Sequence, residues 1–192
     1  MKKRYKIIVN QDPNMCVPAC ILMILKRHNL DKGYSQLGLA TKFLKFQTSE
    51  KDKEMYPNVK IAKKFEDQGC HVNDLNQQFF KPEGIPLKET YVDWKAVQDS
   101  FDYDANYVKN LILNNDADII VSLDYSLVNS KHKPSRHVVL IEGIDEQNNC
   151  LILSPVGIDY ENITERKEAT VDTLIRAMRV INGGFWIISK IA

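Results

Sequence analysis

The sequence predicts an α+β protein in which a helical N-terminal half packs on a C-terminal antiparallel sheet. Before about residue 115, apolar residues recur mainly at helical spacing. After that point, β-branched residues gather in short runs separated by polar turns, a pattern typical of strands. Helices followed by strands favour the segregated α+β class. A length of 192 residues fits one domain, which we expect to span residues 1–192.

The composition excludes several classes of protein. A net charge of +1 lacks the basic excess of a nucleic-acid-binding protein. No run approaches the roughly 18 consecutive apolar residues of a membrane span, and the N-terminus lacks the apolar core of a signal peptide. Four scattered cysteines are too few for a disulfide scaffold. We therefore expect a cytoplasmic protein with reduced thiols, no cofactor, no metal, no nucleic-acid partner and no membrane segment.

The N-terminal half is expected to be mostly helical. Pro18 suits the first turn of the first helix, and Ser35 is placed to cap the second. Residues 73–93 contain three prolines or glycines without a clear period, and we expect them to be irregular. The expected elements, in order, are a strand over 4–9 and helices over 16–28, 35–44, 59–69 and 94–114.

The C-terminal half is expected to form the sheet. Thr170 can cap a short helix there, and Gly183-Gly184 marks a turn before the last strand rather than a cleavage site. The expected elements are strands over 117–123, 136–143, 150–153 and 185–189, with a helix over 171–180.

Cys16 stands where a polar, proline-containing loop meets the first apolar helix. The unpaired N–H groups and the positive dipole end of a helix favour a thiolate over a thiol at this position. A nucleophile could therefore form here. On local grounds alone the commoner role is different, because free cysteines are often small buried hydrophobes in a core helix.

Two stretches resemble the motifs of the papain-like cysteine peptidases, and most closely those of the bacteriocin-leader-processing (double-glycine) peptidases and their stand-alone relatives. In that group a Gln lies a few residues before the Cys, which is followed by a pattern like Gly-Pro-Ala-Cys-Leu-x-Met. Here Gln11 precedes Cys16, and the chain continues Val17-Pro18-Ala19-Cys20-Ile21-Leu22-Met23. The histidine of the group begins a strand that runs into a Gly-hydrophobic-Asp turn, as the stretch from His137 to Asp145 does here.

The resemblance implies a papain-like fold and a cysteine peptidase-like hydrolase or acyl transferase that attacks a peptide or amide bond. Cys16 would be the nucleophile and His137 its base, since such a pair needs an imidazole within hydrogen-bond reach of the thiol and an acceptor that holds the ring. Gln11 would donate to the oxyanion together with the backbone N–H of Cys16. Three other histidines fit the role of the base less well: His28, His71 and His132.

The residue that orients the histidine is where this chain departs from the group. The group has an Asp or Asn next to a Pro on the following strand, and here that slot is Ser154-Pro155. A serine hydroxyl can accept a hydrogen bond, but it carries no charge to stabilise an imidazolium. Asp159, in the loop that follows, is the alternative orienting residue.

Two alternatives to this enzyme stay open. Ser154, and Val17 in place of a small residue after the cysteine, favour a degenerate, non-catalytic relative that binds a peptide or leader segment without cutting it. A zinc site is the other, although its Cys-x-x-x-Cys half falls on a predicted helix rather than in a knuckle. Its ligands would be Cys16, Cys20, Cys70 and His71. The substrate, the choice between hydrolysis and transfer, and the oligomeric state are left open.

Overall fold

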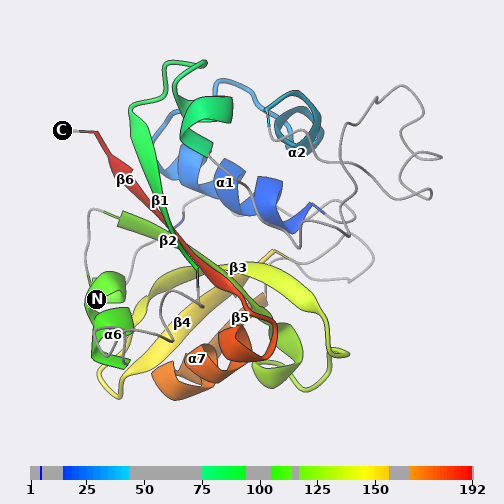
Figure 1. Ribbon diagram of the computed structural model, residues 1–192, viewed down its shortest axis with the longest axis vertical. Coiled ribbons are helices and arrows are strands. Elements are labelled where there is room, and N and C mark those ends of the chain that lie inside the picture. The colour runs from blue at the N-terminus through cyan, green and yellow to red at the C-terminus, as the bar shows by residue number, and fades with distance from the viewer. Residues whose placement is uncertain are drawn as a thin grey trace.

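The computed structural model describes residues 5, 15–43, 75–93, 105–113, 117–155 and 165–191. These residues are built around a six-stranded antiparallel sheet with the order β1-β6-β2-β3-β4-β5 (Figure 1). The strands are β1 (Leu87–Asp93), β2 (Ala117–Asp124), β3 (Arg136–Ile144), β4 (Asn149–Ser154), β5 (Glu165–Thr170) and β6 (Gly184–Lys190).

Helices lie on both faces of the sheet. On one face is α1 (Cys16–Arg27), accompanied by α2 (Gln36–Gly38) and the π-helical turns η1 (Leu39–Phe43) and η2 (Asn76–Phe80). On the other are α6 (Ala105–Leu113) and α7 (Val171–Val180), with the short 3-10 helix η3 (Tyr125–Leu127) following β2. Among the described residues, no helix has both the length and the apolar character needed to cross a membrane.

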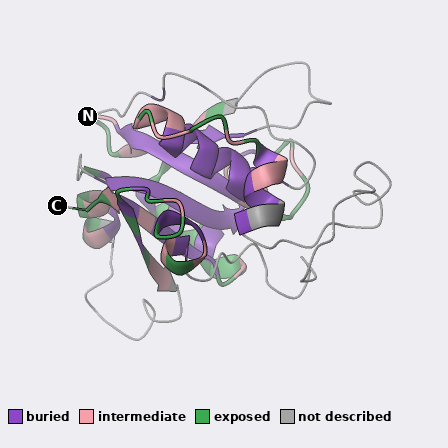
Figure 2. Cartoon of the chain, turned by 90° about the horizontal axis from the view of Figure 1, so that it is seen from above, coloured by how far each residue is buried: buried purple, intermediate pink, exposed green. Residues whose placement is uncertain are grey.

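The period-2 alternation of the strands supplies each face with its own core. We call these the α1 face and the α7 face. On β3, Val138 and Leu140 belong to the α1 face, whereas Val139 and Ile141 belong to the α7 face. Figure 2 shows α1 almost wholly buried over buried strands. The apolar run that predicted this helix is explained by that position, since it packs against protein on nearly every side.

The predicted fold class, a helical N-terminal half over a C-terminal sheet, is wrong. The sheet dominates the structure, β1 comes from the N-terminal half, and helices cover both of its faces rather than forming one layer. β1 falls within residues 73–93, which were expected to be irregular. Its inward position Glu89 interrupts the apolar alternation, because this carboxylate is buried to accept a hydrogen bond from Leu75 N at 2.7 Å. A polar residue at an inward position breaks the apolar/polar alternation from which a strand is predicted.

Several expected elements are present near their predicted bounds. The helix over 171–180 is α7, and Thr170 caps it by accepting from Thr173 N at 3.1 Å. Ser35 caps α2 by accepting from Gly38 N at 3.0 Å. Of the helix expected over 94–114, the described part is α6. The helix expected over 59–69, and the strand over 4–9 apart from Tyr5, lie outside the described residues.

Two adjacent glycines mark where the turn after α7 enters β6. A Cβ at Gly183 would lie 2.0 Å from the carbonyl oxygen of Ser122 on β2, and one at Gly184 would lie 2.6 Å from that of Val92 on β1. Real Cβ atoms do not approach backbone oxygens so closely, so both positions require glycine in this packing. Gly183 thus ends the turn and Gly184 begins β6, close to the turn before the last strand that the sequence predicts.

Candidate active site

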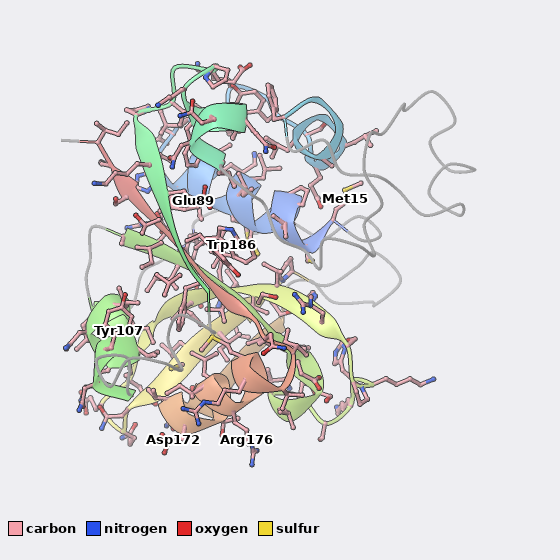
Figure 3. All side chains as sticks on the ribbon, in the orientation of Figure 1. Met15, Glu89, Tyr107, Asp172, Arg176 and Trp186 are labelled. Carbon is pink, nitrogen blue, oxygen red and sulfur yellow. The ribbon has the colours of Figure 1, made fainter. Side chains whose placement is uncertain are left out.

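Cys16 is the first residue of α1. The residue before it, Met15, is labelled in Figure 3 at the start of this helix and makes no side-chain capping hydrogen bond. Cys16 is 5% exposed, and the nine residues that follow it are also buried. The thiol therefore sits at the positive end of a helix dipole and close to a core, which is an environment that can favour a thiolate.

Two contacts fix α1 against the sheet. Near its start, the Cys20 thiol donates to the carbonyl oxygen of Val138 on β3, with a sulfur–oxygen distance of 3.7 Å. At its end, His28 Nε2 lies 2.7 Å from the carboxylate of Asp118 on β2. Because β2 and β3 are antiparallel, with Ile119 opposite Ile141, Asp118 is level with the far end of β3. The helix therefore runs in the same direction as β3, as Figure 1 shows.

The spacing of these contacts sets the height of Cys16 along the sheet. Between the two contacts the helix advances about 12 Å, and the strand beneath it advances about 13 Å. Between these contacts, helix and strand therefore advance by nearly the same distance. Cys16 lies one turn before Cys20, about 6 Å nearer the start of β3. This step, nearly two residues of a strand, brings Cys16 to the level of the first two residues of β3, Arg136 and His137.

His137 is the second residue of β3 and is half-buried. Its Nε2 atom lies 2.9 Å from Ser154 Oγ on β4, and its ring packs edge-to-face on Tyr125 with centroids 5.1 Å apart. Ser154 is 1% exposed. With Nε2 protonated, the hydroxyl accepts this hydrogen bond and Nδ1 is the basic nitrogen of the ring. The ring is thus held from two sides.

The two faces of the sheet separate Cys16 from the histidine side chain. His137 pairs with Leu123 of β2 and follows the alternation of the α7 face, on which Tyr125 also lies. Cys16 belongs to the core of the α1 face. A pairing between the thiol and the imidazole therefore runs around the start of β3 rather than across one face. His137 is the second residue of β3 and so lies next to that strand end.

Two other cysteines have environments that suppress thiolate formation. Cys20 is fully buried, and desolvation raises the pKa of its thiol far above the ordinary range. Burial, with a smaller contribution from the Asp145 charge, raises the pKa of Cys150 to about 12. Both thiols are protonated at neutral pH, when neither can act as a nucleophile.

Several residues singled out from the sequence lie outside the described residues. They are Gln11, Asp159, Cys70 and His71. The oxyanion donor, the alternative orienting residue and half of the zinc set therefore remain predictions. Among the residues that the structure does describe, no group of three metal-binding side chains comes together.

A buried carboxylate that the sequence analysis missed lies at the far end of α1. Asp118 is fully buried and accepts hydrogen bonds from Tyr5 Oη at 2.8 Å and from Arg27 Nη1, besides its contact with His28. Burial by itself would raise the pKa of Asp118, but the hydrogen bond with His28, the Arg27 charge and the Tyr5 hydroxyl together lower it. The available signal was an aspartate directly before the apolar stretch Ile119-Ile120-Val121 of a buried strand.

A shallow hollow of about 220 Å³ lies away from Cys16, over β4 and β5. At its edge Arg166 Nε and Nη2 donate to the buried Glu142 carboxylate at 2.8 and 3.2 Å. Each charge of this pair is already matched by the other. The hollow is lined by Glu142, Leu151, Ile152, Arg166, Lys167 and Glu168.

Comparisons with known proteins give little to set beside this geometry. No protein-family model matches the chain, and no curated protein matches it. Among solved structures, the chain is similar to the Pseudomonas avirulence protein AvrPphB, at 9% sequence identity and a TM-score of 0.33, over 96% of this chain and 97% of that one. A likeness of this degree carries no argument about fold or activity. The function has to be argued from the site.

Proposed function

We propose that the protein is a thiol hydrolase or acyl transferase of the cysteine peptidase type, which attacks a peptide or amide bond through Cys16. The observation that carries the proposal is the registration of α1 on β3. With Cys20 against Val138, the thiol one turn earlier falls near the start of β3, where the His137 Nε2 atom lies 2.9 Å from Ser154 Oγ. The sequence resemblance to leader-processing peptidases favours a peptide as the substrate.

The chemistry follows from these positions. His137 Nδ1 takes the proton of the Cys16 thiol, and the thiolate attacks the carbonyl carbon of the substrate. The backbone N–H of Cys16 and the side-chain amide of Gln11 donate to the oxyanion that forms. As the carbon–nitrogen bond breaks, the imidazolium returns the proton to the leaving amine. Water then releases the acyl group by hydrolysis, or a second amine accepts it by transfer.

The reaction requires a reduced thiol at Cys16. None of the three described cysteines is in a disulfide bond. The cytoplasm, which the sequence leads us to expect as the location, keeps thiols reduced.

Thiol reactivity tests the nucleophile. We expect limiting iodoacetamide at pH 7 to alkylate Cys16 at least about tenfold faster than Cys20 or Cys150, whose thiols are protonated. His137→Gln should slow the Cys16 reaction, since the base is lost. Cys20→Ala, which removes a thiol from the same helix face, is the matched control and should leave the rate unchanged. Preferential labelling of Cys70 or Cys150 with an inert Cys16 would reject the proposal.

Turnover tests the reaction itself. A pooled peptide library, read by mass spectrometry, should show cleavage or transfer products with the wild-type chain and none with Cys16→Ala. Gln11→Ala should lower turnover by ~100-fold or more, as loss of one oxyanion donor typically does. An unchanged rate in Gln11→Ala would remove that residue from the mechanism.

A second candidate function is peptide binding without cleavage, and the neutral Ser154 is the observation that favours it. A serine hydroxyl, unlike a carboxylate, gives no charge stabilisation to an imidazolium next to a thiolate. Ser154→Asp should then raise both the alkylation rate of Cys16 and any peptidase activity. If Asp159 is the orienting residue instead, Asp159→Ala abolishes reactivity and Ser154→Asp changes little. If neither substitution alters an unreactive Cys16, the binding function is the correct one.

A further inference from the structure

The loop that joins β2 to β3, residues 125–135, is basic and borders the candidate active site. We call it the β2–β3 loop. Between Ser126 and Ile141 the chain contains no acidic residue, whereas Lys131, Lys133 and Arg136 are cationic. This concentration of positive charge stands out in a chain whose net charge is only +1.

Hydrogen bonds hold the two ends of this loop together. Asp124 Oδ1 accepts from Ser126 N at 3.1 Å and from Ser135 N at 3.3 Å, so one carboxylate bridges the beginning and the end of the loop. The backbone N–H of Tyr125 donates to the carbonyl oxygen of Ser135 at 3.3 Å. The Asp124 charge is thereby directed at backbone N–H groups within the loop base. It does not reach the lysines through any contact among the described residues.

The middle of the loop is fixed as well. Asn129 is 4% exposed, and its side-chain oxygen accepts from Lys131 N at 3.2 Å. The carbonyl oxygen of the same asparagine accepts from His132 N at 3.0 Å. The backbone of Lys131 and His132 is therefore tied to a buried residue, and Lys133 follows directly in the chain.

Ring contacts connect this loop to His137. The Tyr125 ring lies between two imidazoles, with its centroid 4.9 Å from that of His132 and 5.1 Å from that of His137. The two imidazoles are therefore no more than about 10 Å apart, close to one Debye length at 0.1 M salt. Lys131 and Lys133 flank His132 in sequence and are exposed.

The third cation of this stretch is used differently. Arg136 Nη2 donates to the carbonyl oxygen of Ile181, at the C-terminal end of α7, at 2.5 Å. The negative end of a helix dipole offsets its charge. Lys131 and Lys133 form no ion pair within the described part of the chain. These two lysines are thus the charges available to a substrate.

We propose that Lys131 and Lys133 make the site selective for acyl substrates that carry a carboxylate close to the bond attacked, such as peptides with acidic side chains. This inference rests on the proposed function and names the substrate class for the same site. The lysines act by raising the local concentration of anionic substrate and by attracting its carboxylate once it is bound. The near-neutral net charge of the chain argues against a long polyanion as the ligand.

A pair of alkylating reagents measures this selectivity without a known substrate. Iodoacetate carries a carboxylate, and iodoacetamide is its neutral counterpart of nearly the same shape. Both report on the Cys16 thiolate, so the ratio of their rates at Cys16 cancels changes in thiolate population and access. In the full-length chain at low salt, replacing both lysines (Lys131→Glu with Lys133→Glu) should lower the iodoacetate to iodoacetamide ratio about tenfold. The effect should shrink to less than about twofold in 1 M salt.

Lys190→Glu is the matched control. Lys190 is exposed at the end of β6, next to the Ser189 that pairs with Ala117, and so lies at the opposite end of the sheet from His137. It is roughly 20 Å away along the strands, about two Debye lengths at 0.1 M salt. This variant makes a single charge reversal, so it is compared with Lys131→Glu alone and with Lys133→Glu alone.

The outcomes separate this inference from the proposed function. A ratio that falls with the loop lysines, recovers in salt and ignores Lys190→Glu supports the selectivity. A reactive Cys16 whose ratio is unchanged by the double replacement, or equally changed by the remote control, overturns the selectivity and leaves the thiol hydrolase standing. A Cys16 that neither reagent alkylates overturns the proposed function, and this inference falls with it.

Discussion

At its C-terminal end α1 is tied to the sheet by charged side chains, whereas at its N-terminal end it carries a thiol and no side-chain cap. Arg27 and His28 both contact the fully buried Asp118, which also binds the Tyr5 hydroxyl. At the other end the N-cap residue Met15 makes no capping hydrogen bond. The same helix thus has one end held by a buried carboxylate and one end whose N-cap side chain makes no capping hydrogen bond.

This difference suggests that the C-terminal end of α1 positions the helix, while the N-terminal end carries the candidate nucleophile. A buried charge must be matched by its partners or it strongly destabilises the fold, so Asp118 fixes where α1 ends along β2. A helix is stiff over three turns, and its far end is then fixed along β3 as well. The position of the thiol end along the sheet therefore follows from contacts made at the other end of the helix. Rigid elements place reactive groups more accurately than loops do.

The largest effect on stability is expected from removing the Asp118 carboxylate, which we call the anchor because it fixes the C-terminal end of α1 on the sheet. Asp118→Ala leaves Arg27, His28 and Tyr5 without their shared acceptor and should lower the free energy of unfolding by about 3–5 kcal/mol, measured by urea denaturation. Glu146→Ala, at an exposed turn, is the control and should change it by less than about 0.5 kcal/mol. A loss below about 1 kcal/mol for Asp118→Ala would mean that α1 is held by apolar packing alone.

The anchor should also be sensitive to acid. The pKa of Asp118 is lower in the folded chain than in the unfolded one, so the carboxylate contributes stability above the unfolded pKa and loses it as the pH falls through the folded pKa. The difference in unfolding free energy between the wild type and Asp118→Asn should therefore be constant above about pH 5 and narrow steadily towards pH 2. A constant difference across this range would contradict the lowered pKa.

Tyr5→Phe should have an intermediate effect, because it deletes one hydrogen bond to the same carboxylate. We expect a loss of about 1.5–3 kcal/mol in unfolding free energy, as for hydrogen bonds to charged groups. Tyr34→Phe is a matched control, since the Tyr34 hydroxyl donates to the Glu83 carboxylate at 2.7 Å but in a less buried place. Its loss should be under about 1 kcal/mol. Equal losses of unfolding free energy in Tyr5→Phe and Tyr34→Phe would show that burial does not strengthen the hydrogen bond to Asp118.

The smallest effect is expected at the thiol end. Cys16→Ser should change the unfolding free energy by less than about 1 kcal/mol in either direction, because it replaces one atom at the helix end, and it should remove alkylation at position 16. Cys20→Ser should be more costly, since its sulfur is fully buried against β3. A larger loss at Cys16 than at Cys20 would make Cys16 a structural residue.

Elements with a complete local signal could be predicted from the sequence. The start of α1 follows from an apolar run after a proline-containing loop, and the start of α7 follows from the Thr170 cap. β1 and β5 could not be predicted, because Glu89 occupies an inward position in the first and the second is largely polar, at the end of the strand order. The helical-half fold class failed for the same reason.

The candidate site shows the same limit. Cys16, His137 and Ser154 could be named from their motifs, and the structure puts the last two 2.9 Å apart. That Cys16 belongs to the α1 face while His137 follows the α7 face could not be predicted, because strand register decides the face and depends on pairing partners far along the chain. The Asp118 network joins residues separated by 90 positions or more in sequence. No local pattern carries such information.

The glycine pair at the start of β6 has a consequence for how this chain tolerates mutation. Every missense change at Gly183 or Gly184 adds at least a Cβ, and in each case that atom would collide with the backbone of a neighbouring strand. In a saturation-mutagenesis scan for folded protein, both positions should therefore reject even alanine, as strictly as the apolar core does, although they lie at a turn. The close approach of β2 and β1 to the start of β6 thus requires glycine at both positions. The peptide bond between the two residues is out of reach of any peptidase while the sheet is intact.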